Sequence, residues 1–193
     1  MSELCRPLRV DIAADTGIVG PAESTRVLER RLSDMRGLYQ DLEATEALIA
    51  KCDPLLYQVF AAAIPDEADH LLFGTTVLQP GRVGDEFFMT KGHYHAVERT
   101  AEVYHCLAGR GIILMETRGG ATAEQFLGPG QAVYIPPGWA HRSVNVGDEP
   151  FVFFYAMPGG AGHDYATFEK LGFRRIVVAR AGEVAILPNP RLG

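Results

Sequence analysis

The feature that most constrains the fold of this chain is a series of short β-rich runs that begins at Leu55 and continues almost to the end. The runs are rich in β-branched and aromatic residues and are separated by glycine or proline. They comprise residues 55–60, 71–81, 86–95, 102–116, 131–146, 151–160, 174–179 and 183–187. About eight strands at this spacing predict an all-β double-sheet jelly roll or small barrel, not alternating β and α units.

One segment departs from this β pattern, because residues 41–52 have an apolar stripe at helical spacing before Pro54, which stops a helix. Residues 1–40 show no clear pattern, and we expect them to supply edge strands or a dimer arm. The chain has 193 residues and no repeat or low-complexity linker, which favours one domain. We expect an extension at residues 1–50 and a barrel at residues 55–193.

Charge and hydropathy exclude several classes of partner. The net charge is −6, and no basic run offers a face to nucleic acid. No apolar run reaches the length of a membrane span, and the first ten residues carry two arginines and a glutamate instead of a signal sequence. The three cysteines are far apart and predict reduced thiols. We therefore expect a cytoplasmic protein without a nucleic-acid or membrane partner.

Four side chains along the β-rich region predict a metal site. His93 and His95 stand two apart in a strand-like run, so both imidazoles can reach one ion. Glu102 opens the next run, which we expect to be the neighbouring antiparallel strand. His141 follows a rigid turn at Pro136, Pro137 and Gly138, just before a strand that would carry its imidazole inward.

These spacings resemble the two motifs of the cupins. The second motif, G-x5-P-x-G-x2-H-x3-N, matches completely at Gly130, Pro136, Gly138, His141 and Asn145. The first departs in that six residues separate His95 from Glu102, where three or four are usual, and in the position of the preceding glycine, Gly84. Glu98 is the alternative carboxylate, but only Glu102 is followed after six residues by the glycine of the motif.

Three imidazoles and one carboxylate, without a thiolate, suit one divalent ion per chain, which we expect to be Fe(II), Mn(II), Ni(II) or Zn(II). The choice among these ions stays open. Octahedral coordination by four protein ligands leaves two positions for substrate oxygens or water, which indicates a catalytic role.

Further segments make the assignment narrower, because the cupin fold hosts many chemistries. Residues 30–41, 75–96, 101–111 and 161–173 resemble segments of the archaeal-type cupin phosphoglucose isomerases. The long spacing between His95 and Glu102 is itself similar to that family. The resemblance covers nearly the whole chain, and it implies interconversion of glucose 6-phosphate and fructose 6-phosphate in a homodimer.

The resemblance also implies site residues. Substrate-binding roles fall on Tyr57, Thr76, Thr90, Gly92, Tyr104 and Tyr165, and His163 is a candidate for proton movement or ring opening. Tyr104 has the same strand parity as Glu102, whereas His105 points the other way and, like His70, is expected at the surface or in packing. The family places a tyrosine at the position of Met157, so either that hydroxyl is lost or Tyr155 replaces it.

Glu102 is the candidate base for an enediol route, and a hydride shift between the two carbons is the alternative. Other functions remain open, namely a mannose-6-phosphate isomerase, an iron dioxygenase or a non-catalytic sugar-binding cupin. A phosphate loop at 158–162 is not expected, since GK[ST] is missing.

Overall fold

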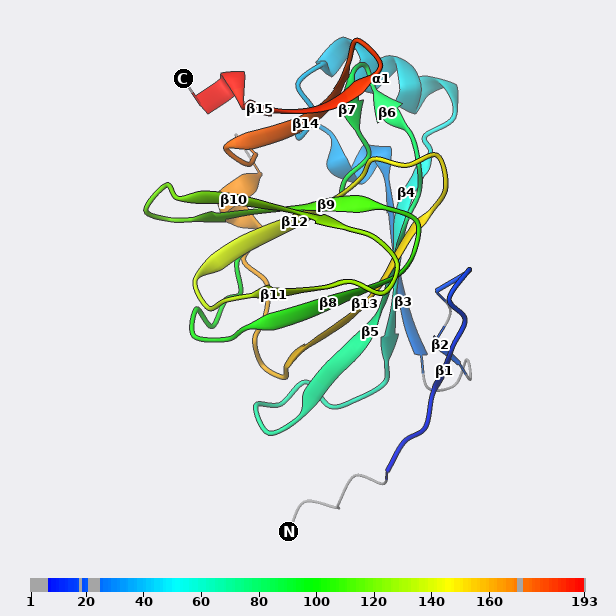
Figure 1. Cartoon of the computed structure of the whole chain (residues 1–193), viewed down its shortest axis with the longest axis vertical. Coiled ribbons are helices and arrows are strands. Elements are labelled where there is room, and N and C mark those ends of the chain that lie inside the picture. The colour runs from blue at the N-terminus through cyan, green and yellow to red at the C-terminus, as the bar shows by residue number, and fades with distance from the viewer. Residues whose placement is uncertain (1–6, 18, 21–24, 170–171, 193) are drawn as a thin grey trace.

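The computed structural model describes residues 7–17, 19–20, 25–169 and 172–192, and strands dominate its regular structure (Figure 1). The strands of the first half are β1 (Asp11–Ile12), β2 (Val19–Gly20), β3 (Thr25–Arg31), β4 (Leu55–Ala62), β5 (Leu71–Leu78), β6 (Arg82–Val83) and β7 (Glu86–Phe87). Those of the second half are β8 (Glu102–Ala108), β9 (Gly111–Thr117), β10 (Thr122–Leu127), β11 (Ala132–Ile135), β12 (Trp139–Asn145), β13 (Phe151–Pro158), β14 (Arg175–Arg180) and β15 (Glu183–Pro188).

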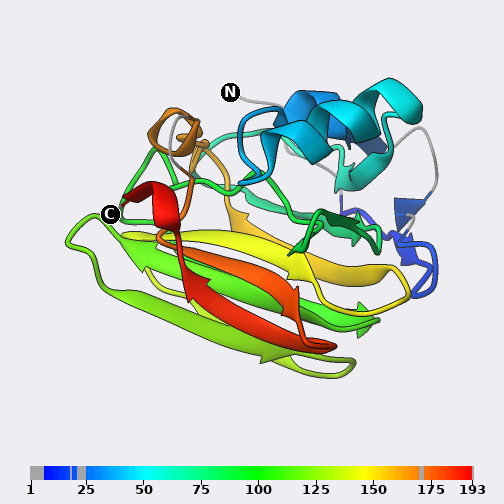
Figure 2. The same cartoon turned by 90° about the horizontal axis from the view of Figure 1, so that it is seen from above.

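Two sheets enclose the main core. A six-stranded sheet has the order β11-β8-β13-β5-β4-β3, and a three-stranded sheet has the order β10-β9-β12. Figures 1 and 2 show these sheets as two layers, and buried side chains of both, such as Ile113 of β9 and Phe153 of β13, belong to one apolar cluster. A separate four-stranded sheet, β15-β14-β7-β6, continues the molecule at one end. The predicted all-β cupin fold is confirmed.

The chain changes sheets within runs that the sequence presents as continuous. The run 102–116 divides into β8 of the large sheet and β9 of the small one, and the run 131–146 divides into β11 and β12. Gly109 allows the first change, because its φ is +70° and a Cβ there would lie 2.3 Å from Pro150 O. Strand β10 was not predicted, since half of its side chains are exposed and it lacks a strong apolar pattern.

The expectation of a long strand at residues 86–95 is wrong. Only Glu86–Phe87 forms a strand, and the chain from 88 to 101 is irregular apart from isolated bridges. One bridge pairs His93 with His141 of β12, through backbone hydrogen bonds of 3.2 and 3.0 Å. The neighbours of β8 are β11 and β13, so the two histidines do not lie on the strand beside Glu102.

The predicted helix is present as α1 (Leu42–Lys51), and the side chain of Asp41 caps its amino end by accepting a hydrogen bond from Ala44 N. Short 3-10 turns occur at η2 (Leu32–Met35), η3 (Ala166–Phe168) and η4 (Pro190–Leu192). Strand β3 lies at the edge of the large sheet, as expected for part of the first forty residues. None of the helices in the described residues has the length and apolarity needed to cross a membrane.

Candidate metal centre and substrate pocket

The predicted ligands His93, His95, Glu102 and His141 meet at one point between the two main sheets. One ligand atom from each lies within 4.8 Å of those of the others. Glu102 begins β8, His141 is in β12, and the other two histidines come from the irregular segment between β7 and β8. His95, Glu102 and His141 are buried, and the Nε2 atom of His93 is buried although part of its ring is exposed.

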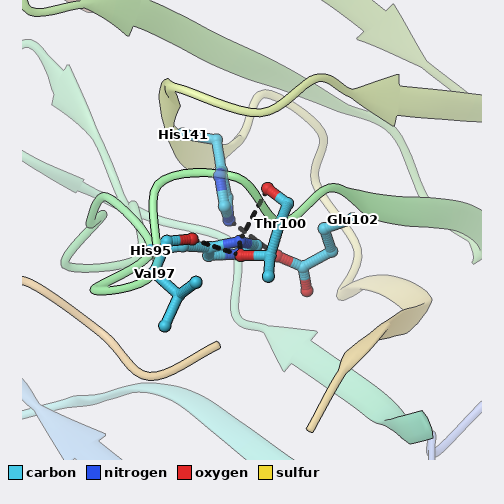
Figure 3. Close-up of polar contacts among 5 residues, drawn as sticks. All are labelled: His95, Val97, Thr100, Glu102 and His141. Atoms are coloured by element: carbon cyan, nitrogen blue, oxygen red, sulfur yellow. Dashed lines mark hydrogen bonds and ion pairs between the residues drawn. The ribbon is translucent and has the colours of Figure 1, made fainter. Parts of the chain in front are cut away.

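The position of His95 is set by Thr100, as Figure 3 shows. Nδ1 of His95 lies 2.8 Å from Thr100 Oγ1 and 3.2 Å from the Thr100 carbonyl oxygen. The Thr100 hydroxyl donates its own proton to Val97 O at 2.6 Å, so it accepts from the imidazole. Nδ1 therefore carries the proton, and Nε2 presents a lone pair toward Glu102. This is the outer contact that orients a histidine for metal binding.

The nitrogen atoms converge on the carboxylate in an arrangement that fits a bound cation. Glu102 Oε2 lies 3.1 Å from His95 Nε2 and 2.9 Å from His141 Nε2, and the second contact does not have hydrogen-bond geometry. Among the described buried atoms, His93 Nε2 and both ring nitrogens of His141 have no hydrogen-bond partner. Lone pairs facing a carboxylate repel it unless positive charge lies between them. The donor set fits a divalent ion.

The protonation states of the cluster also suit metal binding. Burial, followed by the neighbouring imidazoles of His141, His163 and His95, holds the pKa of His93 well below its ordinary range. Burial alone would raise the pKa of Glu102, but its contacts with His141 and His95 outweigh that effect and the pKa is lowered. At neutral pH His93 is therefore neutral and Glu102 is ionised, which are the forms that bind a metal.

A cavity of about 150 Å³ opens beside the cluster. Its wall contains Glu102, His93 and His141 together with every residue for which a substrate role was predicted, namely Tyr57, Thr76, Thr90, Gly92, Tyr104, His163 and Tyr165. These residues come from β4, β5, β8 and the two segments that follow β7 and β13. Residues separated by more than one hundred positions are thus brought to one site.

Thr90 leaves a hydroxyl proton available on the cavity wall, and Gly92 lies close to it in the chain. Thr90 Oγ1 accepts a hydrogen bond of 3.0 Å from Ser143 N, so its own proton remains for a ligand oxygen. Gly92 has a φ of +73°, and a Cβ there would lie 2.5 Å from the Phe173 ring. Glycine is therefore required at this position by packing as well as by backbone conformation.

His163 and Tyr165 complete the mouth of the cavity. The ring of His163 lies 4.4 Å from that of His93, and it stacks on Tyr165 with 5.5 Å between ring centroids. His163 is exposed on its outer side, and partial loss of solvent on the inner side lowers its pKa despite the opposing charge of Glu102. Its imidazole is therefore neutral at pH 7.

Met157, where the resemblance implies a tyrosine, lines the cavity, and so does Tyr155. Met157 and Tyr155 are buried, and Tyr155 pairs with Tyr104 across β13 and β8. Burial, followed by the charge of Glu102, raises the pKa of Tyr155, so its phenol is neutral. Tyr155 therefore contributes a hydroxyl-bearing side chain to the cavity wall, whereas Met157 contributes none.

Two cations near the site were not predicted. Lys91 lines the cavity, and Arg142 is fully buried behind it, with Nη2 donating a 2.7 Å hydrogen bond to Lys91 O and the guanidinium 4.5 Å from the Phe173 ring. Each is adjacent in sequence to a residue that was singled out, Gly92 and His141. This adjacency was the only signal in the sequence that could have placed Lys91 and Arg142 near the site. Nothing in the sequence shows that Arg142 is buried.

The remaining candidates lie away from the cluster. Glu98, the alternative carboxylate, forms a surface ion pair with Arg118, with 3.0 Å between its oxygen and Arg118 Nε. His105 is half-buried on the opposite side of β8 from Glu102, in agreement with its parity. Cys52 and Cys106 are free thiols, and Cys5 lies outside the described residues. A larger hollow of about 670 Å³ lies between β10 and β11 and contains none of the predicted site residues.

Sequence comparison decides the family. The model of the family described as "Glucose-6-phosphate isomerase (GPI)" matches residues 29–189. The chain belongs to the glucose-6-phosphate isomerase family. This membership confirms the predicted enzyme class, an aldose–ketose isomerase. A relative named glucose-6-phosphate isomerase from Thermococcus gammatolerans is 47% identical over 189 residues, which is 98% of each chain.

Other relatives extend across archaea and bacteria. One from Pyrococcus abyssi, with the same name, is 46% identical over 185 residues and 96% of each chain. A protein of Rhizobium meliloti named putative glucose-6-phosphate isomerase 2 is 38% identical over 177 residues, covering 91% of this chain and 86% of that one. Among solved structures, Bacillus subtilis oxalate decarboxylase matches 55% of this chain and 26% of its own, with 20% identity and a TM-score of 0.43.

Proposed function

We propose that this chain is a divalent-metal-dependent glucose-6-phosphate isomerase that interconverts glucose 6-phosphate and fructose 6-phosphate in glycolysis and gluconeogenesis, in the cytoplasm. Family membership supports the reaction. The observation that carries the proposal is the opening of the four-residue cluster onto a cavity lined by all of the expected substrate residues. A phosphorylated hexose in this cavity meets the cluster at one end and hydroxyl and amide donors at the other.

His93, His95, Glu102 and His141 would hold the ion, with His95 fixed in the binding tautomer by Thr100. When bound, the divalent ion supplies positive charge that stabilises negative charge on the oxygen atoms of the sugar in the transition state. The donor set favours Fe(II), Mn(II), Ni(II) or Zn(II). The cavity wall itself excludes much of the water, because Tyr57, Tyr104 and Thr76 are buried.

Glu102 is the residue that we assign to proton transfer between C1 and C2. Both of its short contacts with imidazoles use Oε2, and the residue lines the cavity, so Oε1 is the atom assigned to the substrate proton. Its pKa is lowered, which keeps the carboxylate ionised at neutral pH. An ionised carboxylate within reach of the substrate carbon is a competent general base.

His163 is assigned to proton movement at the substrate oxygens and to ring opening. Its imidazole is neutral at pH 7, because partial burial lowers its pKa, and a neutral imidazole can both accept and donate a proton. The ring lies against His93 and Tyr165, at the mouth of the cavity, where the sugar oxygens would enter. Tyr104 and Tyr155, with neutral buried phenols, offer further hydrogen bonds to the sugar.

The phosphate is assigned to the wall formed by Thr76, Thr90, Gly92 and Lys91. The proton of Thr90 is available, since its oxygen accepts from Ser143 N. Lys91 adds the positive charge that the hydroxyl and amide donors lack, and its Nζ lies 5.3 Å from the Tyr165 ring at the cavity mouth. A dianion bound by one ammonium and several neutral donors is a common arrangement.

A coupled assay of fructose 6-phosphate conversion, before and after dialysis against a chelator, tests the proposal directly. We expect turnover to be lost on chelation and restored by Mn(II) or Fe(II). The assay should run with and without oxygen, and with mannose 6-phosphate as a second substrate. Full activity in a preparation shown by elemental analysis to be free of metal contradicts the metal requirement. Absence of isomerisation in the metal-loaded protein contradicts the function.

We also propose that the protein acts as a homodimer. Strand β3 is the edge of the large sheet, and Val27 and Leu28 on it are exposed, with 54% and 38% of their surfaces accessible. An uncovered strand edge with apolar side chains is commonly covered by a second subunit. Light scattering at micromolar concentration should give twice the 21.1 kDa of the chain. A mass of one chain is the contrary result.

A further inference from the structure

Residues 161–169, which we name the rim segment, carry His163 and Tyr165 and are joined to β13 by Gly159 and Gly160. Their backbone pairs with the segment that holds the metal ligands. Tyr94 N and Asp164 N each donate to the other's carbonyl oxygen, at 3.2 and 2.8 Å. Ala96 N donates to Gly162 O at 3.3 Å, and Val97 N donates to Ala161 O at 2.9 Å. These backbone hydrogen bonds form a short ladder that positions the rim segment relative to His93 and His95.

One arginine, Arg118, contacts side chains of both the ligand segment and the rim segment. Arg118 directly follows β9, and its Nε lies 3.0 Å from Glu98 Oε1 on the ligand segment. Its Nη2 lies 3.0 Å from Asp164 Oδ2, and its Nη1 donates to Thr167 Oγ1 at 3.4 Å, both on the rim segment. Its guanidinium also lies 4.3 Å from the ring centroid of Tyr94. The planar fork of arginine suits such a set of partners.

Asp164 is the point through which this contact reaches the site. It stands between His163 and Tyr165, and its Oδ2 also accepts a 2.8 Å hydrogen bond from Thr167 Oγ1. Movement of Asp164 therefore moves both neighbouring rings. The end of the rim segment has a second tie, because Glu169 Oε1 lies 3.4 Å from Lys91 Nζ. Arg118 itself does not line the cavity.

We propose that Arg118 is a positioning residue for the isomerisation, and that it acts through Asp164 to hold His163 and Tyr165 against the metal cluster. The inference rests on the proposed function, since it assigns a role to the same site. The side chain of Arg118 is 51% exposed and that of Asp164 27% exposed. Solvent-exposed ion pairs contribute little to folding stability. We therefore expect the ion pairs of Arg118 to affect the position of the rim segment more than the stability of the fold.

Steady-state kinetics of three variants test the proposal, namely Arg118→Ala, Asp164→Asn and the double variant, all loaded with metal. We expect kcat/KM to fall about tenfold in each, since small misplacement of groups that contact substrate has effects of this size or larger. The double variant should fall no further than the singles, because both remove one contact. Arg118→Lys should recover part of the loss. Additive effects, or a change below about twofold, overturn the proposal.

Arg36→Ala is the matched control, because Arg36 forms an exposed ion pair with Glu46, at 2.7 Å, away from the cavity. Its kcat/KM should equal that of the wild type. Metal content measured on the same samples should be unchanged in the Arg118 variants. If Arg118→Ala loses activity only in proportion to lost metal, Arg118 supports the ligand segment instead, and the proposal is wrong.

Hydrogen exchange gives a readout that does not depend on activity. In Arg118→Ala, the amides of Tyr94, Ala96, Val97 and Asp164 should exchange faster, whereas amides of β9 and β12 should be unchanged. Unchanged exchange at these four amides overturns the proposal. If the wild type does not isomerise hexose phosphates, the proposed function fails, but faster exchange would still show that Arg118 holds the rim segment.

Discussion

The two sides of the substrate cavity are held in place by different forces. On one side the proposed metal ligands Glu102 and His141 belong to strands of two packed sheets, and both are almost completely buried. On the other side the rim segment is tied by ion pairs of Arg118 and Lys91 that are in contact with solvent. Buried contacts are little screened by salt and are costly to disrupt, whereas exposed ion pairs are screened and weak.

This difference suits two separate roles, a fixed metal centre and a rim that is held more weakly. In the proposed function the metal centre keeps its geometry through every turnover, and its four residues are positioned by strand register and by contacts such as that of Thr100 with His95. In the proposed function the rim admits a phosphorylated sugar and places His163 and Tyr165, which line the cavity, beside it. Weak, reversible contacts are suited to that task. Changes in the buried side should therefore have larger effects than changes at the rim.

The largest effect is expected for Glu102→Gln at the buried centre. The amide keeps an oxygen for the metal but loses the basicity of the carboxylate, so kcat should fall by roughly 10² to 10⁴, the usual contribution of general acid–base catalysis. Kinetics and metal analysis on the same samples give kcat per bound ion. His141→Ala is the comparison, since it should lower metal occupancy first and recover in excess metal. Nearly wild-type kcat in fully loaded Glu102→Gln means that the base lies elsewhere, with His163 the first candidate.

Next in size is the loss of stability in Arg142→Met, behind the cavity. Arg142 is buried close to Glu86 and Glu116, and Glu86 Oε1 has no hydrogen-bond partner among the described atoms. Removing the cation leaves buried carboxylates without their counter-charge, which costs about 3–5 kcal/mol. Urea unfolding measures this loss. The exposed Arg36→Ala should lose less than about 1 kcal/mol, and an equally small loss in Arg142→Met would show that the buried cation is dispensable.

A smaller effect, on metal affinity, is expected for Thr100→Val. This substitution removes the hydroxyl that orients His95 but leaves all four proposed metal ligands in place. Loss of such an outer contact typically weakens metal binding about 10- to 100-fold. Metal titration of the chelated protein measures the affinity, and Thr122→Val on β10 is the control. Unchanged affinity in Thr100→Val would show that the backbone alone positions the imidazole.

Tyr57 lines the cavity, and Tyr57→Phe should change how the free energy of unfolding depends on pH. Burial, followed by the neighbouring Tyr165, raises the pKa of Tyr57 from 10.0 to about 12. The raised pKa means that stability from the neutral phenol is fully present below pH 10 and is lost as the pH rises toward 12. The wild type should lose about 1.4 kcal/mol more than Tyr57→Phe between pH 9 and pH 11. Urea unfolding across this range tests it, with the exposed Tyr134→Phe as control, and parallel slopes for wild type and Tyr57→Phe refute it.

The smallest effect on stability is expected at the rim. Arg118→Ala should lower the free energy of unfolding by less than about 1 kcal/mol, because its ion pairs are exposed. Urea unfolding at low and high salt should show little difference from the wild type. A loss as large as that of Arg142→Met would mean that the rim is part of the structural core, and the contrast between the two sides of the cavity would be lost.

Much of the metal site could be predicted from local spacing. His93, His95 and His141 were predicted as ligands together with Glu102, and the structure brings all four together. The location of Glu102 at the start of β8 followed from the alternation of its strand. The strand expected to carry His93 and His95 was wrong, because their segment is held by bridges to β12 and the rim segment instead of by a ladder of its own.

The sequence by itself determined the elements whose pattern is local: most of the β-rich runs, the helix that ends before Pro54, and the two motifs whose four candidate ligands meet in the structure. Only the tertiary structure decided which strands face one another, that Arg142 is buried, and that Arg118 joins the ligand segment to the rim. The physical reason is that alternation and turn chemistry act over a few residues. The burial of Arg142 and the ion pairs of Arg118 depend on which sheets pack together. A single sequence does not show how its sheets pack.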